Sequence, residues 1–213
     1  MLAQEQFQIL LRDHIKPALG EFGFRKKAST FALRGTDGWA IINFQKDRQS
    51  TFDQVPFTIN SGISSDLLGR FNDETPDAKK PPKEYECQWR NRIGCYLRGG
   101  PGLYGTRDPK MTDRWWVQDS ATDPADVAVD IIAALKNHAV PQLLRRMPDT
   151  SLLEACRTID TAGGEMFRAT EFAALLHAYG SPEEFHMFVL HELATCRGKP
   201  HEAYWRKQLA KLT

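Results

Sequence analysis

The sequence predicts an α+β protein: an antiparallel sheet of four or five strands with helices packed on one face, followed by an all-helical C-terminal extension. Between Trp39 and Gly62, two runs of alternating apolar and polar residues flank a polar link, which is typical of adjacent antiparallel strands. Residues 3–20 and 124–147 instead carry apolar side chains at helical spacing. After residue 148 only helical patterns follow.

The N-terminal elements follow from local signals. The helix over residues 3–20 ends at Gly20, and a bend is expected at Pro17 because proline lacks a backbone N–H. A first strand over residues 24–34 leads into Gly35-Thr36-Asp37-Gly38, whose composition is that of a hairpin turn.

The remaining elements are placed in the same way. Ser65 or Asp66 is expected to cap a short helix that ends at Phe71. Further strands are expected over residues 85–97 and 114–118. The C-terminal helices are predicted over residues 150–161, 168–179, 182–196 and 199–212. We therefore divide the chain into an α+β domain, residues 1–147, and a helical extension, residues 148–213.

The central pair of strands has two different faces. The apolar face is expected to enter the core with Phe31, Leu33, Ile42, Phe44, Phe57 and Ile59. The opposite face carries several carboxamides, each with two donors and an acceptor that need partners. Arg92 on the next strand can add a cation, and one of two adjacent tryptophans should turn to this face while the other enters the core. The predicted binding residues are Asn43, Gln45, Thr58, Asn60, Arg92, Trp115 and Trp116.

Composition limits the partners. The chain has 213 residues, with 28 basic against 27 acidic side chains, so a net charge of +1 gives no field that attracts nucleic acid or an acidic membrane. No apolar run is long enough to span a bilayer, and the N-terminus does not read as a signal peptide. Four widely spaced cysteines without a Cys-x-x-Cys pair are expected to be reduced thiols of a cytoplasmic protein. No pattern indicates an oligomeric state.

Short motifs of catalytic or metal sites are incomplete. Residues 100–105 match G-x-G-x-x-G, but Pro109 prevents the helix that a dinucleotide loop needs. In the segment 191–195, Thr195 stands where a zinc protease has its second histidine. Cys87 and Cys95, eight apart on one expected strand, would be ~26 Å from each other. We therefore expect no catalytic residues, no metal site and no cofactor.

The order of several short segments resembles a known family. They are Gly23-Phe24, the basic residues 25–27, the strand at 41–46, the FTIN-x-G run at 57–62, Arg92-Ile93-Gly94, and Trp115-Trp116 before a helix. Over roughly residues 5–147 this order is similar to bacterial proteins grouped as domain of unknown function 4304. The resemblance implies a small α+β domain, with no established activity and no catalytic residues to carry over.

Three classes of function fit these observations. The first is a bacterial, cytosolic, non-enzymatic binding module whose polar-aromatic sheet face takes a protein or peptide partner. The second is a structural protein without ligand, in which the amides pair with the backbone. The third is a small-molecule binder or enzyme that uses the same face as a pocket. We favour them in that order.

Overall fold

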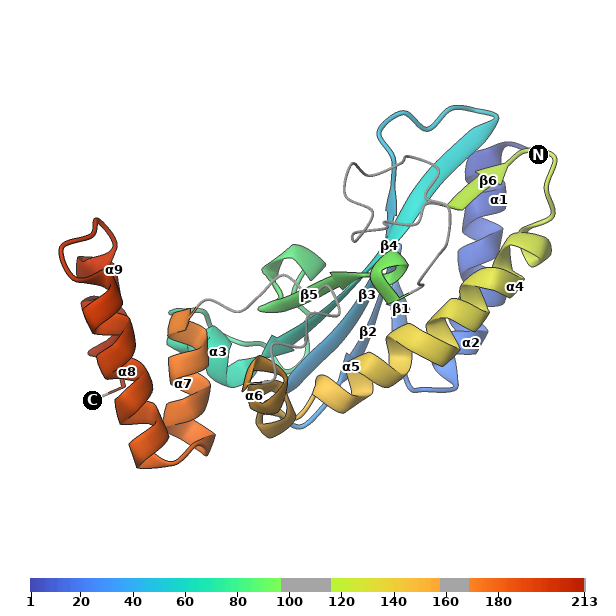
Figure 1. Ribbon diagram of the computed structural model, residues 1–213. Helices are drawn as coiled ribbons and strands as arrows, with labels where there is room; N and C mark the ends of the chain where they lie inside the picture. The colour runs from blue at the N-terminus through green and yellow to red at the C-terminus, as the bar shows by residue number, and fades with distance from the viewer. Residues whose placement is uncertain (97–115, 158–168, 213) are drawn as a thin grey trace.

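The computed structural model describes residues 1–96, 116–157 and 169–212 (Figure 1). In these residues the chain forms a six-stranded antiparallel sheet with helices, which confirms the α+β prediction with at least one strand more than expected. The strands are β1 (Arg25–Lys27), β2 (Thr30–Arg34), β3 (Gly38–Lys46), β4 (Gln54–Ser65), β5 (Trp89–Arg92) and β6 (Trp116–Asp119).

The long strand β4 organises the sheet. One of its edges pairs with β3 along nine residue positions. The other edge is shared, because β6 pairs with its first part and β5 with its second part. The order is therefore β1-β2-β3-β4-β5, with β6 also on β4.

The helical segments before β6 are α1 (Ala3–Ile9), η1 (Leu10–Ile15), α2 (Lys16–Gly20), α3 (Asp66–Phe71), η2 (Glu84–Glu86) and η3 (Ile93–Tyr96). Those after it are α4 (Pro124–Ala134), η4 (Leu135–Ala139), α5 (Val140–Arg146), α6 (Asp149–Arg157), α7 (Ala169–Tyr179), α8 (Pro182–Cys196) and α9 (Glu202–Leu209). Ser65 is the cap of α3, since its Oγ accepts a hydrogen bond from the Leu68 N–H at 3.2 Å.

Both long helices contain a π-helical stretch just before a proline. The stretch η1 precedes Pro17, and η4 precedes Pro141. Proline cannot donate to the carbonyl four residues earlier and its ring collides with that carbonyl, and a wider turn relieves both problems. The predicted helices over 3–20 and 124–147 therefore continue past their prolines as α1–η1–α2 and α4–η4–α5.

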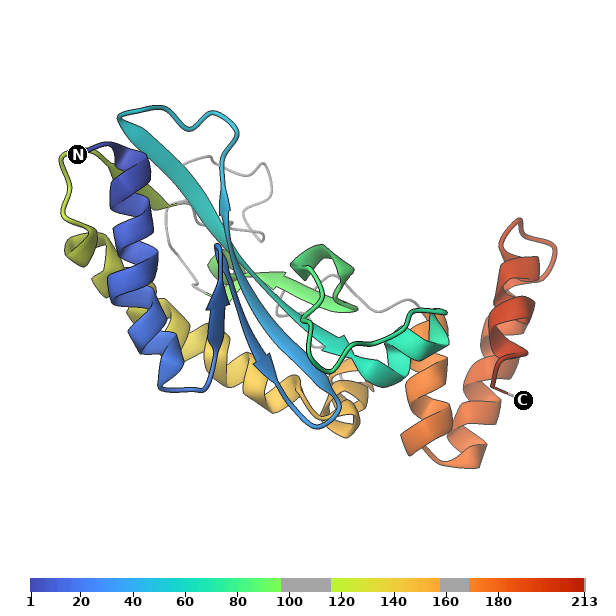
Figure 2. The ribbon, with the colours of Figure 1, turned by 180° about the vertical axis from the view of Figure 1, so that it is seen from behind.

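These two long helices lie along one side of the sheet (Figures 1 and 2). Between them and the strands lies the core, in which Phe44 is 1% exposed. Its ring is 5.7 Å from that of Phe31 and 6.1 Å from that of Phe57, which in turn lies 5.0 Å from Phe7 of α1. The predicted core face is thus buried, with Leu33 half-buried at its margin.

Two predicted strands were wrong in extent. The expected strand over residues 24–34 is a hairpin, because Ala28 adopts a left-handed conformation (φ 52°) between β1 and β2. The expected strand over residues 85–97 shortens to the four residues of β5, flanked by the 3-10 turns η2 and η3. Cys87 and Cys95 therefore do not lie on a common strand.

The helices α6–α9 lie close to their predicted positions. Side chains of α6 and α7, such as Leu152 and Leu175, belong to the same apolar core as the sheet. Helices α8 and α9 pack on α7 around a second cluster with Cys196 and Trp205, at the end of the molecule away from β1 (Figure 1). The apolar core thus continues across residue 148, and the division into two domains there stays a prediction.

Candidate functional site

We call the sheet face opposite the long helices the polar face. One straight row of side chains crosses five strands on this face. In register, Lys27 faces Thr30, Thr30 faces Asn43, Asn43 faces Asn60, and Asn60 faces Arg92. We name these five residues the amide row. Because adjacent strands lie about 4.8 Å apart, the row is about 19 Å long.

Hydrogen bonds join the carboxamides of this face. Asn43 Nδ2 donates to Thr30 Oγ1 at 2.8 Å, and Asn60 Nδ2 donates to Gln45 Oε1 at 2.7 Å. Gln45 stands opposite Thr58 in the register. The structure therefore brings five of the predicted residues onto one face: Asn43, Gln45, Thr58, Asn60 and Arg92.

The cluster is graded from buried to exposed. Thr58 and Asn60 are buried, Asn43 is half-buried, and Gln45 and Arg92 are exposed. Within the described residues, Oδ1 of both asparagines and Nε2 of Gln45 have no hydrogen-bond partner. Asn43 Oδ1 and Gln45 Nε2 thus remain for a molecule from outside, whereas Asn60 is only 4% exposed.

The predicted aromatic wall needs a correction. Trp116 stands opposite Phe57, on the face that the helices cover, and its ring stacks on Phe57 at 6.2 Å. Its Nε1 donates to Asp130 Oδ2 at 2.8 Å, so Trp116 is a core residue and not part of the polar face. The other predicted tryptophan, Trp115, lies outside the described residues. Trp39 is a half-buried aromatic side chain on the polar face, with the Arg34 guanidinium 5.5 Å from its ring centre.

The segment before β5 covers the part of the polar face next to the amide row. There Cys87 packs with Ala32 and Ile41 in a small apolar cluster. A Cβ atom at Gly62 would lie 2.8 Å from both Cβ and Sγ of Cys87, so only glycine allows this close approach. Burial raises the pKa of the Cys87 thiol, which therefore stays protonated and is no nucleophile.

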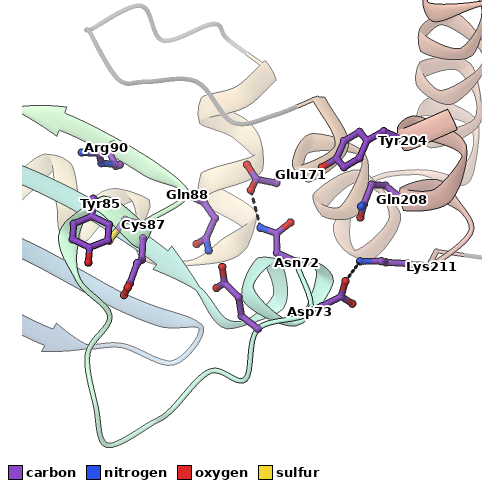
Figure 3. Close-up of a pocket in the computed structure, with 12 residues that line it drawn as sticks. Asn72, Asp73, Tyr85, Cys87, Gln88, Arg90, Glu171, Tyr204, Gln208 and Lys211 are labelled. Atoms are coloured by element: carbon purple, nitrogen blue, oxygen red, sulfur yellow. Dashed lines mark hydrogen bonds and ion pairs between the residues drawn. The ribbon is translucent and has the colours of Figure 1, made fainter. Parts of the chain in front are cut away.

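A separate cavity of about 520 Å³ lies between the end of α3, the segment around β5 and the C-terminal helices (Figure 3). Its lining is Asn72, Asp73, Glu74, Tyr85, Glu86, Cys87, Gln88, Arg90, Glu171, Tyr204, Gln208 and Lys211. None of the amide-row residues lines it, so the cavity is not the pocket expected on the polar face.

Two polar contacts beside this cavity join the end of α3 to the C-terminal helices. Asn72 Nδ2 donates to Glu171 Oε1 at 2.9 Å, and Lys211 Nζ donates to Asp73 Oδ2 at 2.7 Å (Figure 3). The lining carries the carboxylates Asp73, Glu74, Glu86 and Glu171 and the cations Arg90 and Lys211. Sequence analysis missed this site because its residues come from segments about a hundred positions apart, and no short motif connects them.

A buried carboxyl group lies where the β2–β3 turn meets α6 and α7. Asp149 is 2% exposed, its backbone N–H donates to Asp37 Oδ2 at 3.1 Å, and Tyr179 Oη donates to its Oδ2 at 3.4 Å. Burial is the largest cause that raises the pKa of Asp149 to about 6. Nearby, Arg34 holds Asp66 with two hydrogen bonds of 2.9 and 2.5 Å. In the described part of the chain, no group of three or more histidine, cysteine or acidic side chains could hold a metal ion.

Fold and surface thus define an α+β protein with one helix-covered sheet face and one polar face. The profile of the family described as Domain of unknown function (DUF4304) matches residues 15–145, and the chain belongs to this family. The match lies inside the region that the sequence motifs indicated. Neither the curated proteins nor the solved structures contain a significant match to the chain. Among the residues that the structure describes, no helix has both the length and the apolar character needed to cross a bilayer.

Proposed function

We propose that the protein is a non-enzymatic binding module of the bacterial cytoplasm that presents its polar face to a protein or peptide partner. The observation that carries this proposal is the carboxamide cluster around the amide row, with its unused donors and acceptors. In a purely structural polar network, the donors and acceptors normally find their hydrogen-bond partners within the protein. Here the two asparagines donate to side chains, not to the backbone, and leave their own oxygens without a partner in the described residues.

Shape favours a macromolecular partner over a small molecule. The amide row extends over about 19 Å, which exceeds most small ligands. The polar cavity lies elsewhere, between β5 and the C-terminal helices. With the Cys87 thiol protonated, that cavity also lacks an activated cysteine nucleophile. A binding surface that runs across the strands therefore accounts for the polar face better than an active site.

The test compares partner capture by two variants that are both folded. We expect the double variant Asn43→Ala/Gln45→Ala to lose a partner that the unchanged protein captures from an extract of its host, measured by quantitative mass spectrometry. Gln8→Ala is the matched control, because Gln8 is an exposed amide on α1, behind the sheet. Loss of the partner in the control, or its retention in the double variant, would contradict the proposal.

Thermal unfolding separates binding from structure. Gln45 is exposed, so water can replace its Oε1 as the acceptor for Asn60 Nδ2 when the Gln45 side chain is removed. The expected loss in the free energy of unfolding is therefore at most about 1 kcal/mol. A structural role would cost about 1–3 kcal/mol per lost buried hydrogen bond. A large loss of stability together with retained capture would support the structural alternative.

A further inference from the structure

Helix α8 has an exposed outer face. We define this face by five exposed residues at helical spacing, which are Glu183, Met187, Leu190, His191 and Ala194. We infer that it is a self-association surface, on which α8 of a second copy of this chain packs in antiparallel orientation. The inference goes beyond the proposed function and does not depend on it.

Helix α8 is apolar on two opposite sides. Its inner side carries Phe185 and Val189, which pack in the cluster around Cys196. Met187 and Leu190 lie on the outer face instead, where they are 66% and 50% exposed. A helix at the surface of a protein normally has one apolar side and one polar side, and a helix that is apolar all round is normally buried. The composition of α8 therefore indicates that its outer face is covered by a further surface.

The position of α8 allows a second copy to approach. Figures 1 and 2 show α8 and α9 at the end of the molecule farthest from α1. The amide row lies on strands β1–β5, so pairing through α8 does not use any of its residues. A dimer formed through α8 thus presents two polar faces.

The two ends of the outer face carry opposite charges. Glu183 lies in the first turn of α8, and Lys199 follows the end of the helix. Both residues are exposed and neither forms an ion pair with a described residue, whereas the neighbouring Glu184 is held by Arg157. An antiparallel pair brings Glu183 of each copy to the end of α8 that carries Lys199 of the other copy, whereas a parallel pair brings like charges together. The outer face is therefore complementary to itself, as a two-fold interface requires.

A two-fold axis beside Leu190 gives this arrangement. Met187 then faces Ala194 of the second copy, so a large side chain meets a small one and the helix axes can approach to about 8–10 Å. Helix α8 has 15 residues and is about 22 Å long. Two helices of this length form a smaller contact than the interface of an obligate dimer, so we expect a weak, reversible association.

The experiment measures the mass of the whole protein by sedimentation equilibrium between about 1 and about 200 µM, the range of weak association. We expect a reversible equilibrium between monomer and dimer. Leu190→Asp should weaken dimerisation at least about tenfold, because it buries two carboxylates beside the axis. Val129→Asp is the matched control, since Val129 is an apolar residue of α4 that is 71% exposed, and it should change dimerisation by less than about twofold.

A charge swap tests the orientation of the two helices. Glu183→Lys alone should weaken dimerisation at least about threefold, because it places like charges together at both ends of the pair. The double variant Glu183→Lys/Lys199→Glu restores opposite charges and should associate within about twofold of the unchanged protein. Circular dichroism melts confirm that each variant is folded.

Three outcomes would overturn the inference. A protein that stays monomeric at the highest concentration would show that no second copy covers the outer face. Equal weakening by Leu190→Asp and Val129→Asp would place the interface elsewhere. A charge swap that associates as weakly as Glu183→Lys alone would refute the antiparallel pairing. None of these outcomes bears on the capture of a partner by the polar face, which is tested separately.

Discussion

Phe44 offers the most quantitative test of the core. It lies in the middle of β3, is 1% exposed and contacts the rings of Phe31 and Phe57. Phe44→Ala removes a fully buried ring and leaves a cavity, because the strand β3 is hydrogen-bonded to β2 and β4 and cannot move inward to fill it. The expected loss is about 3–5 kcal/mol in the free energy of unfolding. This is a large part of the ~5–15 kcal/mol that holds a typical domain folded.

Urea unfolding followed by tryptophan fluorescence measures this loss as a shift of the midpoint at constant slope. Phe44→Leu keeps most of the volume and should lose less than about 1.5 kcal/mol, so it remains measurable if the alanine variant does not fold. Phe52→Ala is the control, since Phe52 is 75% exposed and its removal should cost little. A loss below about 1 kcal/mol for Phe44→Ala would refute the assignment of the two sheet faces, since a slip of one residue exchanges them.

Three further predictions concern buried positions. Asp149 has its pKa raised to about 6 in the folded protein, so the folded state binds more protons than the unfolded state between about pH 4 and pH 6. The contribution of this group to the free energy of unfolding therefore falls as the pH rises through that window. Thermal melts at pH 4 and pH 7 should show this fall in the unchanged protein, and Asp149→Asn should remove it. Gly62→Ala should destabilise by about 1–3 kcal/mol in urea unfolding through collision with Cys87, whereas Gly20→Ala, with no atom within 4 Å, should not. Cys87 should resist thiol reagents in the native protein and react after unfolding, and rapid native labelling of this thiol would contradict its burial.

Local sequence patterns were sufficient for the helices and for the two faces of the central strands. Alternation over β3 and β4 placed Phe44 in the core and Asn43 on the other side, because side chains of a strand change sides at every residue. Of the two residues expected to cap the helix that ends at Phe71, Ser65 is the cap, and its Oγ accepts the Leu68 N–H at 3.2 Å.

Other features depend on tertiary contacts that leave no local signal. The hairpin at Ala28 has no glycine or asparagine to indicate its left-handed turn. Which of the two tryptophans enters the core depends on the register of β6 against Phe57, and a one-residue shift reverses the answer. The contact between Asn72 and Glu171 joins residues 99 positions apart, so neither composition nor spacing could predict the cavity beside them.

The central claim is that a partner contacts the polar face of the sheet. Its most direct test is photo-crosslinking in the host with p-benzoylphenylalanine in place of Gln45, an exposed residue beside the amide row, and separately in place of Gln8 on α1. We expect a crosslinked protein partner from position 45 and none from position 8. A partner crosslinked from position 8 but not from position 45 would place the interaction on the helical side and contradict the account.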